Sequence, residues 1–346
     1  MKWPVMQSPV LQWPGMKWLV AVVAAPVIFG AFVAARGVEP LSMYRDMLTS
    51  LVDPAQAETV LVRFAVLLLA GLAVAVPARA GLLNVGGEGQ IVAGAVGAAG
   101  IGLLTDRHLP GGAVLALMVP AAMLAGAAWA GLAALLRIGV QVNEAISTLL
   151  LNFLAVDLML GLIYAPWKDA SGFGQPSSRP LPGTARLPLL ANTTVNAGIV
   201  LALAALAAVW WALNRTAWGF RLRVVGGNPE AARRAGLRVG PLLLGAMLAG
   251  GALAGLAGLL HFAGTEFKLR PGMTTGFGYV GFLASWLALH RPLRVAAAAL
   301  LLAAIAMAGD SLQIDAGLPA ASVNVLMAVV LLVALGTRWK AKETAA

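Results

Sequence analysis

Residues 214–241 read NRTAWGFRLRVVGGNPEAARRAGLRVGP. This stretch contains six arginines and a single acid, Glu230, and long apolar runs lie on both sides of it. Asn228 is suited to cap a helix, Pro229 to occupy the first helical position, and Gly236 to end the helix. The sequence therefore predicts a short surface helix that begins at Pro229 and lies between two membrane spans, where a soluble partner could push on it.

The amino-acid composition is that of a membrane protein. Of the 346 residues, 60% are hydrophobic and 11% are charged, whereas soluble domains are about half apolar and about a quarter charged. The chain has no cysteine, which excludes disulfides and thiolate metal sites. In a soluble protein the net charge of +10 would suggest nucleic acid; here we assign it to cytoplasmic loops and expect no nucleic-acid partner.

Apolar runs of the length that crosses a bilayer number about ten. They cover residues 18–35, 59–77, 88–104, 112–136, 145–164, 194–213, 241–262, 277–289, 293–309 and 320–336. The segment before them contains three prolines and two tryptophans, residues that disfavour a long helix and favour the headgroup zone. We expect residues 1–17 to lie at the interface, 18–336 to form a transmembrane permease domain, and 337–346 to form a cytoplasmic tail.

The positive charges orient the chain. If the N-terminus is inside, fifteen of the 24 Lys and Arg residues fall on the inner side and nine on the outer side, as expected if Lys and Arg favour cytoplasmic loops. Both termini and the loop 214–240 are then cytoplasmic. The Pro- and Gly-rich loop 165–193 is external, either as a docking face for an extracytoplasmic partner or as a connector.

The number of spans predicts a symmetry. About ten spans divide into two halves with an odd number each, which makes the halves antiparallel, as in the inverted repeats of transporters. Gly-rich breaks open one span in each half, at residues 81–90 and 271–281. The run 277–289 is short: its 13 residues are roughly 20 Å of helix. It is either a half-helix at membrane depth or begins as far back as Thr274.

Three polar residues cluster in the first break: Asn84, Glu88 and Gln90. The segment is either a tight turn between spans or part of a solute pathway. A charge deep in lipid costs about 3 kcal/mol or more, so Glu88 must lie at the interface, line a pathway or be paired. Arg79 is near enough in sequence to be its partner.

A second polar group opens the span at residues 145–164. Asn143 or Gln141 can cap this helix, with Glu144 in its first turn. Asn152 lies further along the same span and places an amide in an apolar helix. These groups are either interhelical hydrogen-bond partners or part of a pathway.

Asp157 looks like the most buried acid in any span. An intramembrane carboxylate suggests a functional site, although Asp157 could instead pair with Lys168 near the outer end. The chain has no H-E-x-x-H metal motif and no G-x-x-x-x-G-K-[ST] phosphate loop. If ATP drives this protein, another polypeptide binds the nucleotide.

Four stretches together resemble one family. They are LNVGGEGQ at Leu83–Gln90, NEAISTLLLNF at Asn143–Phe153, VGGNPEAARRAG at Val225–Gly236 and GFGYVGFLA at Gly276–Ala284. They resemble the permease subunits of bacterial ABC importers for simple sugars, nucleosides and branched-chain amino acids, and most closely the nucleoside and simple-sugar branch. The resemblance covers roughly residues 60 to 336.

The resemblance implies an all-α permease that performs no covalent chemistry and binds no cofactor. ATP and Mg would bind on two partner cassettes below the membrane. A second, paralogous permease (or a second copy of this chain) and an extracytoplasmic solute-binding protein would complete an importer in a bacterial cytoplasmic membrane. The coupling residues would be Asn228, Pro229, Glu230, Ala231, Arg233 and Gly236. The candidate pathway residues are Asn84, Glu88, Gln90, Asn143, Glu144, Asn152, Asp157, Phe277 and Tyr279.

Other functions stay open at this point. The solute could be a branched-chain amino acid. A stand-alone transporter driven by an ion gradient would need protonatable groups at the midplane, where Asp157 is the one candidate. A membrane-embedded enzyme would need paired carboxylates, a Ser/His pair or a metal cluster, and the sequence contains no such pattern.

Overall fold

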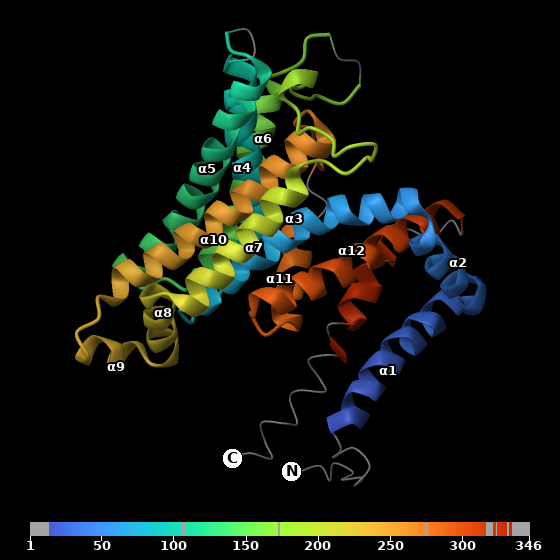
Figure 1. The fold of residues 1–346 in the computed structure, drawn as a ribbon, viewed down its shortest axis with the longest axis horizontal. Helices are drawn as coiled ribbons and strands as arrows, with labels where there is room; N and C mark the ends of the chain where they lie inside the picture. Colours follow the sequence, from blue (N-terminus) through green and yellow to red (C-terminus); the bar gives the residue numbers. More distant parts are fainter. Residues whose placement is uncertain are drawn as a thin grey trace. The chain divides into compact units, whose positions relative to one another are not determined.

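The computed structural model of the chain describes residues 14–105, 108–171, 174–273, 276–315, 321–322, 324–330 and 332–333, with the side chains of 14–22, 50–51 and 311–315 left aside. Within these ranges the regular elements are helices, and β pairing is limited to two isolated bridges (Figure 1). The all-α fold expected from the sequence is confirmed. The chain divides into two units, residues 1–57 with 304–346, and residues 58–303, which are described separately.

In the described part of the chain, seven helices are long and apolar enough to cross a membrane. They are α3 (Pro54–Ala78), α4 (Gly87–Thr105), α5 (Gly111–Gly139), α6 (Glu144–Tyr164), α7 (Gly198–Arg215), α10 (Val239–His261, extended by a π-helix over Phe262–Glu266) and α12 (Pro292–Asp315). They match seven of the expected runs, and the chain is a multi-pass membrane protein.

The other three expected spans have different outcomes. Residues 18–35 fall in α1 (Pro14–Ala34) and 277–289 in α11 (Phe277–Leu287). At 11 residues, α11 is about 16 Å long, roughly half of the hydrocarbon thickness, which agrees with the half-helix alternative. The run 320–336 lies largely outside the described residues, as do Thr274, most of 1–17 and the tail 337–346.

The first unit contains α1 and a helix that the sequence reading missed, α2 (Pro40–Val52). Phe29 and Val33 of α1 form a buried cluster with Met43 of α2 and Leu326. The Tyr44 hydroxyl donates to the carbonyl of Pro26 at 2.6 Å.

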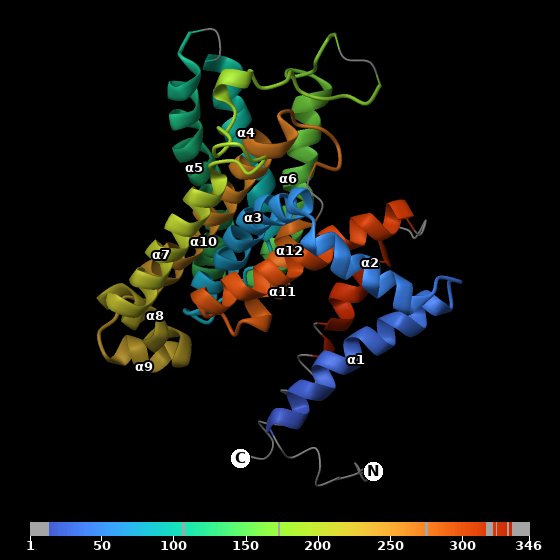
Figure 2. The ribbon, with the colours of Figure 1, turned by 45° about the vertical axis from the view of Figure 1, so that its right-hand side comes forward.

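The helices of the second unit pack against one another (Figures 1 and 2), and they make close contacts at small residues. A Cβ added at Gly255 of α10 would meet α5 at Ala122 and Gly126, and one added at Gly250 would meet Ala73 of α3. Gly94 brings α4 against Gly255 in the same way. The small-residue run in α10 therefore packs closely against three helices, as expected of such runs in membranes.

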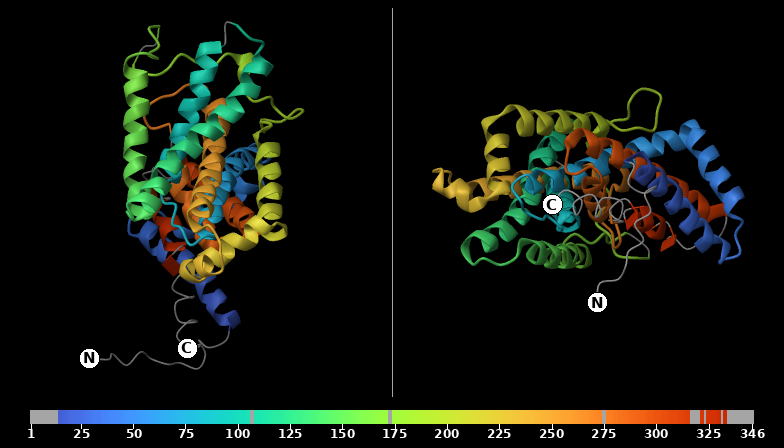
Figure 3. Two further views of the ribbon diagram at one scale, coloured as in Figure 1. Left: turned by 90° about the vertical axis from the view of Figure 1, so that its left-hand side faces the viewer. Right: turned by 90° about the horizontal axis from the view of Figure 1, so that it is seen from below.

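The second unit has two distinct ends (Figures 1 and 3). Two short helices, α8 (Ala217–Gly227) and α9 (Pro229–Arg234), lie at one end, and the loop 165–193 lies at the other. In that loop, the N–H of Ser178 donates to Leu269 and the N–H of Leu187 donates to Ala263. These hydrogen bonds join the loop to residues that follow α10. The loop also contains a short 3₁₀ turn at Gly183–Ala185.

Candidate functional site

The segment between α3 and α4, residues 79–86, turns back into the bundle; we name it the α3–α4 turn. Asn84 is fully buried, and its Nδ2 donates to the carbonyl of Ala73 at 3.1 Å. Ala73 precedes the end of α3 by five residues, about 7.5 Å of helix. Non-helical backbone within a membrane domain survives only against protein or along a water-filled cavity. The α3–α4 turn therefore places its polar side chain at Asn84 inside the helix bundle.

Asn84 and Gln90 form a reciprocal amide pair. Nδ2 of Asn84 donates to Oε1 of Gln90 at 2.9 Å, and Nε2 of Gln90 donates to Oδ1 of Asn84 at 2.8 Å. The N–H of Gly86 also donates to Asn84 Oδ1, at 3.3 Å. Both side chains are buried, where an unpaired amide would cost free energy. The pair fixes the α3–α4 turn and the first turn of α4.

Glu88, in the first turn of α4, reaches the N-terminus of α11. Its carboxylate accepts from the N–H of Gly276 at 3.2 Å and from the N–H of Gly278 at 2.7 Å. The side chain is 6% exposed. Free N–H groups and the dipole of a helix N-terminus favour an anion, which allows the charge to be buried. The described contacts of Glu88 are with α11 and do not include Arg79, which lines a pocket with three other arginines.

Asn152 of α6 joins three segments at this point. Its Oδ1 accepts from the N–H of Gly89 at 2.8 Å. Its Nδ2 donates to the carbonyl of Val85 and to the hydroxyl of Tyr279, both at 3.3 Å. Tyr279 is 42% exposed, and Phe277 is half-buried. The structure thus brings α4, α6 and α11 together, with Tyr279 at the surface of the cluster, while the Phe277 ring packs edge-on against His261.

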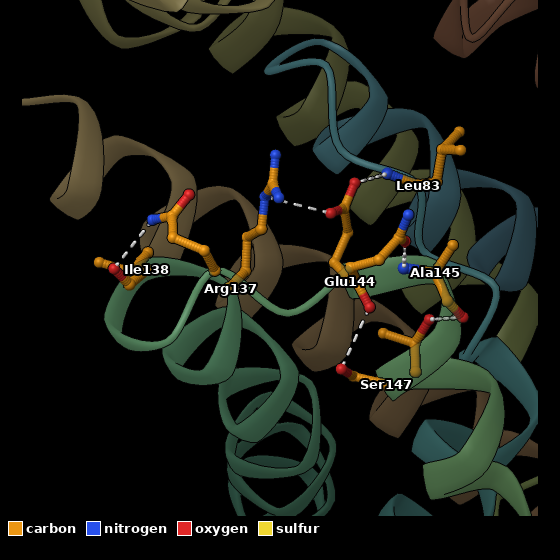
Figure 4. A network of polar contacts seen from close by, with 9 residues as sticks. Leu83, Arg137, Ile138, Glu144, Ala145 and Ser147 are labelled. Atoms are coloured by element: carbon orange, nitrogen blue, oxygen red, sulfur yellow. Dashed lines mark hydrogen bonds and ion pairs between the residues drawn. The ribbon is translucent and has the colours of Figure 1, made fainter.

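Figure 4 shows the polar contacts at the start of α6. Asn143 caps the helix, with its Oδ1 accepting from the N–H of Ala145 at 2.9 Å, so the Asn143 alternative is confirmed over Gln141. Glu144 points back to the preceding segments (Figure 4): Oε1 accepts from the N–H of Leu83 at 3.2 Å, and Oε2 pairs with Arg137 at 3.3 Å. Glu144 therefore ties α6 to the α3–α4 turn and to the end of α5.

Asp157 does not join this cluster. It lies on the exposed face of α6, whereas Thr148, Asn152 and Met159 lie on the buried face. The prediction that Asp157 is the most buried acid in any span is wrong, because its side chain is exposed in the structure of the single chain. Among the described contacts it forms no ion pair with Lys168.

The local structure of the loop 214–240 agrees with the prediction from the sequence. Oδ1 of Asn228 accepts from the N–H groups of Glu230 and Ala231, at 3.0 Å each, and Pro229 opens α9. The helix ends at Arg234, and Gly236 follows with φ +81°, a conformation that glycine adopts without strain. Glu230, Ala231 and Arg233 are exposed.

The helix α9 is attached to the bundle through α8. Ala232 is buried against Val225 of α8 and Val239 of α10. A Cβ added at Gly226 of α8 would run into the carbonyl of Arg79, and Gly81 lies against the same glycine. Contacts therefore connect α9 through α8 to the α3–α4 turn.

The sequence reading missed α8. Thr216 caps it by accepting from the N–H of Gly219 at 3.3 Å. A threonine that follows the end of an apolar run is a recognisable capping pattern, and it could have revealed a second helix in the loop.

Comparison with known proteins gives one family. Residues 56–335 match the family described as branched-chain amino acid transport system / permease component. A glucose ABC transporter permease protein of Haloferax volcanii is 37% identical over 91% of this chain and 85% of its own length. A guanosine ABC transporter permease protein of Bacillus subtilis is 32% identical over 77% of this chain and 76% of its own. A nucleoside ABC transporter permease protein of Lactococcus lactis is 26% identical over 90% and 88%. The chain belongs to this family of ABC transporter permeases.

Proposed function

We propose that this chain is the transmembrane subunit of an ATP-driven importer for a small polar solute, a nucleoside or a simple sugar. Three relatives are named for glucose, guanosine and nucleosides, and the surface of the site offers an aromatic ring and a phenol at Phe277 and Tyr279. A branched-chain amino acid is the alternative, because the family description names that solute.

One observation supports ATP-driven import most directly: a line of contacts joins α9 to the polar site. It passes from Ala232 to α8, from Gly226 to the α3–α4 turn, and through Glu88 to α11. A cassette that closes on ATP and presses on α9 would shift the starts of α4 and α11. The permease would thereby switch between outward and inward access.

The coupling surface is the exposed part of α9. Asn228, Pro229 and Gly236 shape the helix, and we assign contact with the cassette to Glu230, Ala231 and Arg233. ATP and Mg bind on the partner cassettes in this scheme. This chain then binds no cofactor and performs no covalent step.

We place the solute pathway along the exposed faces of α6 and α11. A carboxylate facing lipid costs about 3 kcal/mol or more, yet Asp157 is exposed within a span. This face therefore meets a second permease, or a second copy of the chain, across a water-filled path that Tyr279 and Phe277 also line. The remaining candidate residues hold the walls through the contacts described above: Asn84, Glu88, Gln90, Asn143, Glu144 and Asn152.

The architecture we propose has about ten spans in two inverted five-helix repeats. The helices α4 and α11 hold corresponding places in the two halves, and they meet by their N-termini at Gly87 and Gly278. Both termini and the end that carries α8 and α9 face the cytoplasm of a bacterium, and the loop 165–193 receives a solute-binding protein outside. Residues 1–17 lie at the inner interface, and 337–346 form the tail of the membrane domain 18–336.

Reconstitution tests this function. The chain is placed in proteoliposomes with its cassettes, second permease and binding protein, and uptake of labelled nucleosides, sugars and branched-chain amino acids is measured. ATP on the cassette side should drive uptake of a nucleoside or sugar. Uptake that persists without the cassettes and collapses with an uncoupler would instead establish an ion-coupled transporter.

A further inference from the structure

A pocket of about 420 Å³ opens at the end of the second unit that carries α8. Four arginines line it: Arg79 after α3, Arg223 on α8, and Arg291 and Arg294 around the start of α12. The remaining lining residues are Trp210, Asn214, Pro292 and Leu293. Among the described residues that line the pocket, none is acidic.

Among the described residues, the ion pairs that the chain forms do not include the four pocket arginines. Nε of Arg79 is buried without a hydrogen-bond partner. Burial, and then the charges of Arg223 and Arg291, hold the pKa of the Arg79 guanidinium below its usual range. Burial, and then the charge of Arg79, lower the pKa of the imidazole of His290, which precedes Arg291 in the chain. Like charges gathered in this way repel one another unless an anion lies between them.

The surroundings of the pocket are those of a membrane interface. Trp210 lines it from the last two turns of α7, and Trp211 beside it is 60% exposed. Tryptophan concentrates at the headgroup level of a bilayer, where the lipid phosphates lie. Guanidinium groups match phosphate oxygens in geometry as well as charge. Basic pockets between helices on the cytoplasmic side suit anionic lipid headgroups.

We propose that this pocket binds the phosphate of an anionic phospholipid. The headgroup lies between Arg223 on one side and Arg291 and Arg294 on the other. It thereby holds α8 against the ends of α3 and α12. This site is separate from the solute pathway and does not depend on which solute is carried.

The test uses the purified full-length chain in detergent, with its thermal unfolding temperature as the readout. Short-chain phosphatidylglycerol is titrated beside the matching phosphatidylcholine and inorganic phosphate. Phosphatidylglycerol should stabilise the chain saturably, and phosphatidylcholine should not. Because one arginine near an anionic lipid contributes about fivefold in affinity, Arg223→Gln combined with Arg291→Gln should weaken the effect about 25-fold.

The matched control is Arg221→Gln combined with Arg234→Gln. It removes the same charge from α8 and α9 but leaves the pocket residues intact, and its lipid affinity should stay within about twofold. Should the first double variant not fold, Arg294→Gln alone supplies the comparison, because that side chain is exposed at the start of α12.

Three results would overturn the proposal. Equal stabilisation by inorganic phosphate would make this a site for a free anion. Equal loss in the control variant would reduce the effect to diffuse surface charge. Loss of the lipid effect once the cassettes bind would assign the pocket to the docking surface of the partner.

Discussion

The carboxylate of Glu88 in the first turn of α4 accepts a 2.7 Å hydrogen bond from the N–H of Gly278 in the first turn of α11, across 190 residues of sequence. Two helix N-termini therefore face one anion. Each supplies partial positive charge from its dipole and its free N–H groups. These hydrogen bonds stabilise a buried carboxylate, and they join α4 to α11.

Replacing Glu88 with Gln should destabilise the chain by about 1–2 kcal/mol, because hydrogen bonds to a charged group contribute more than those to a neutral one. The measurement is thermal or denaturant unfolding of the purified chain. Glu58→Gln is the matched control: Glu58 also accepts from a backbone N–H, that of Thr194, but the bond is exposed. A shift for Glu58→Gln as large as that for Glu88→Gln would contradict the role of burial.

Replacing Gly278 with Ala should disrupt the contact between α4 and α11, because the added methyl group would run into the backbone of Glu88. Overpacking of this kind costs about 1–3 kcal/mol. Gly112→Ala is the control, since a Cβ there meets nothing within 4 Å, and it should be neutral or stabilising by up to about 1 kcal/mol. Equal unfolding temperatures for the two variants would show that the helices are not in close contact.

Replacing Glu230 with Arg should leave the protein inserted and folded while abolishing solute-stimulated ATP hydrolysis in the assembled complex. The side chain is exposed, and its ion pairs with Arg233 and Arg234 are 3.4 and 3.6 Å long. Such surface pairs contribute little to stability, so the effect should appear in coupling. Expression level and unfolding temperature serve as controls. Normal coupled transport in this variant would remove α9 from its assigned role.

The parts of this structure that are predictable from sequence are those set by neighbouring residues. The capping of α9 by Asn228 and of α6 by Asn143 follows from local rules, as do seven long apolar helices. The shortness of α11 was also visible in the length of its apolar run. In each of these cases the residues that decide the structure are a few positions apart.

The parts that sequence reading got wrong depend on distant residues. Arg79 was named as a residue that could pair with Glu88 because the two are close in sequence, whereas the Glu88 carboxylate accepts from the N–H groups of Gly276 and Gly278. No hydrophobic pattern reports a contact between backbone N–H groups and a carboxylate so far along the chain. Asp157 was expected to be buried because its neighbours are apolar, but an apolar helix can also face a partner protein or a water-filled path.

The exposed acid of α6 gives the sharpest test of the pathway. The chain has no cysteine, so Asp157→Cys introduces one reactive thiol. In the assembled complex it should react with a charged, water-soluble thiol reagent, because water and the reagent reach it and the reactive thiolate forms more readily there than in apolar surroundings. Leu203→Cys is the matched control, on α7 at an exposed apolar position.

If α6 lines a watered path and α7 faces lipid, Asp157→Cys should react at least about tenfold faster than Leu203→Cys, since apolar surroundings raise the pKa of a thiol. ATP and solute should change its rate, because alternating access opens the path to one side at a time. Equal rates for the two variants would place this face of α6 in lipid, and the proposed pathway would then have to run elsewhere. A fast reaction that ATP and solute leave unchanged would mean that water reaches α6 without alternating access.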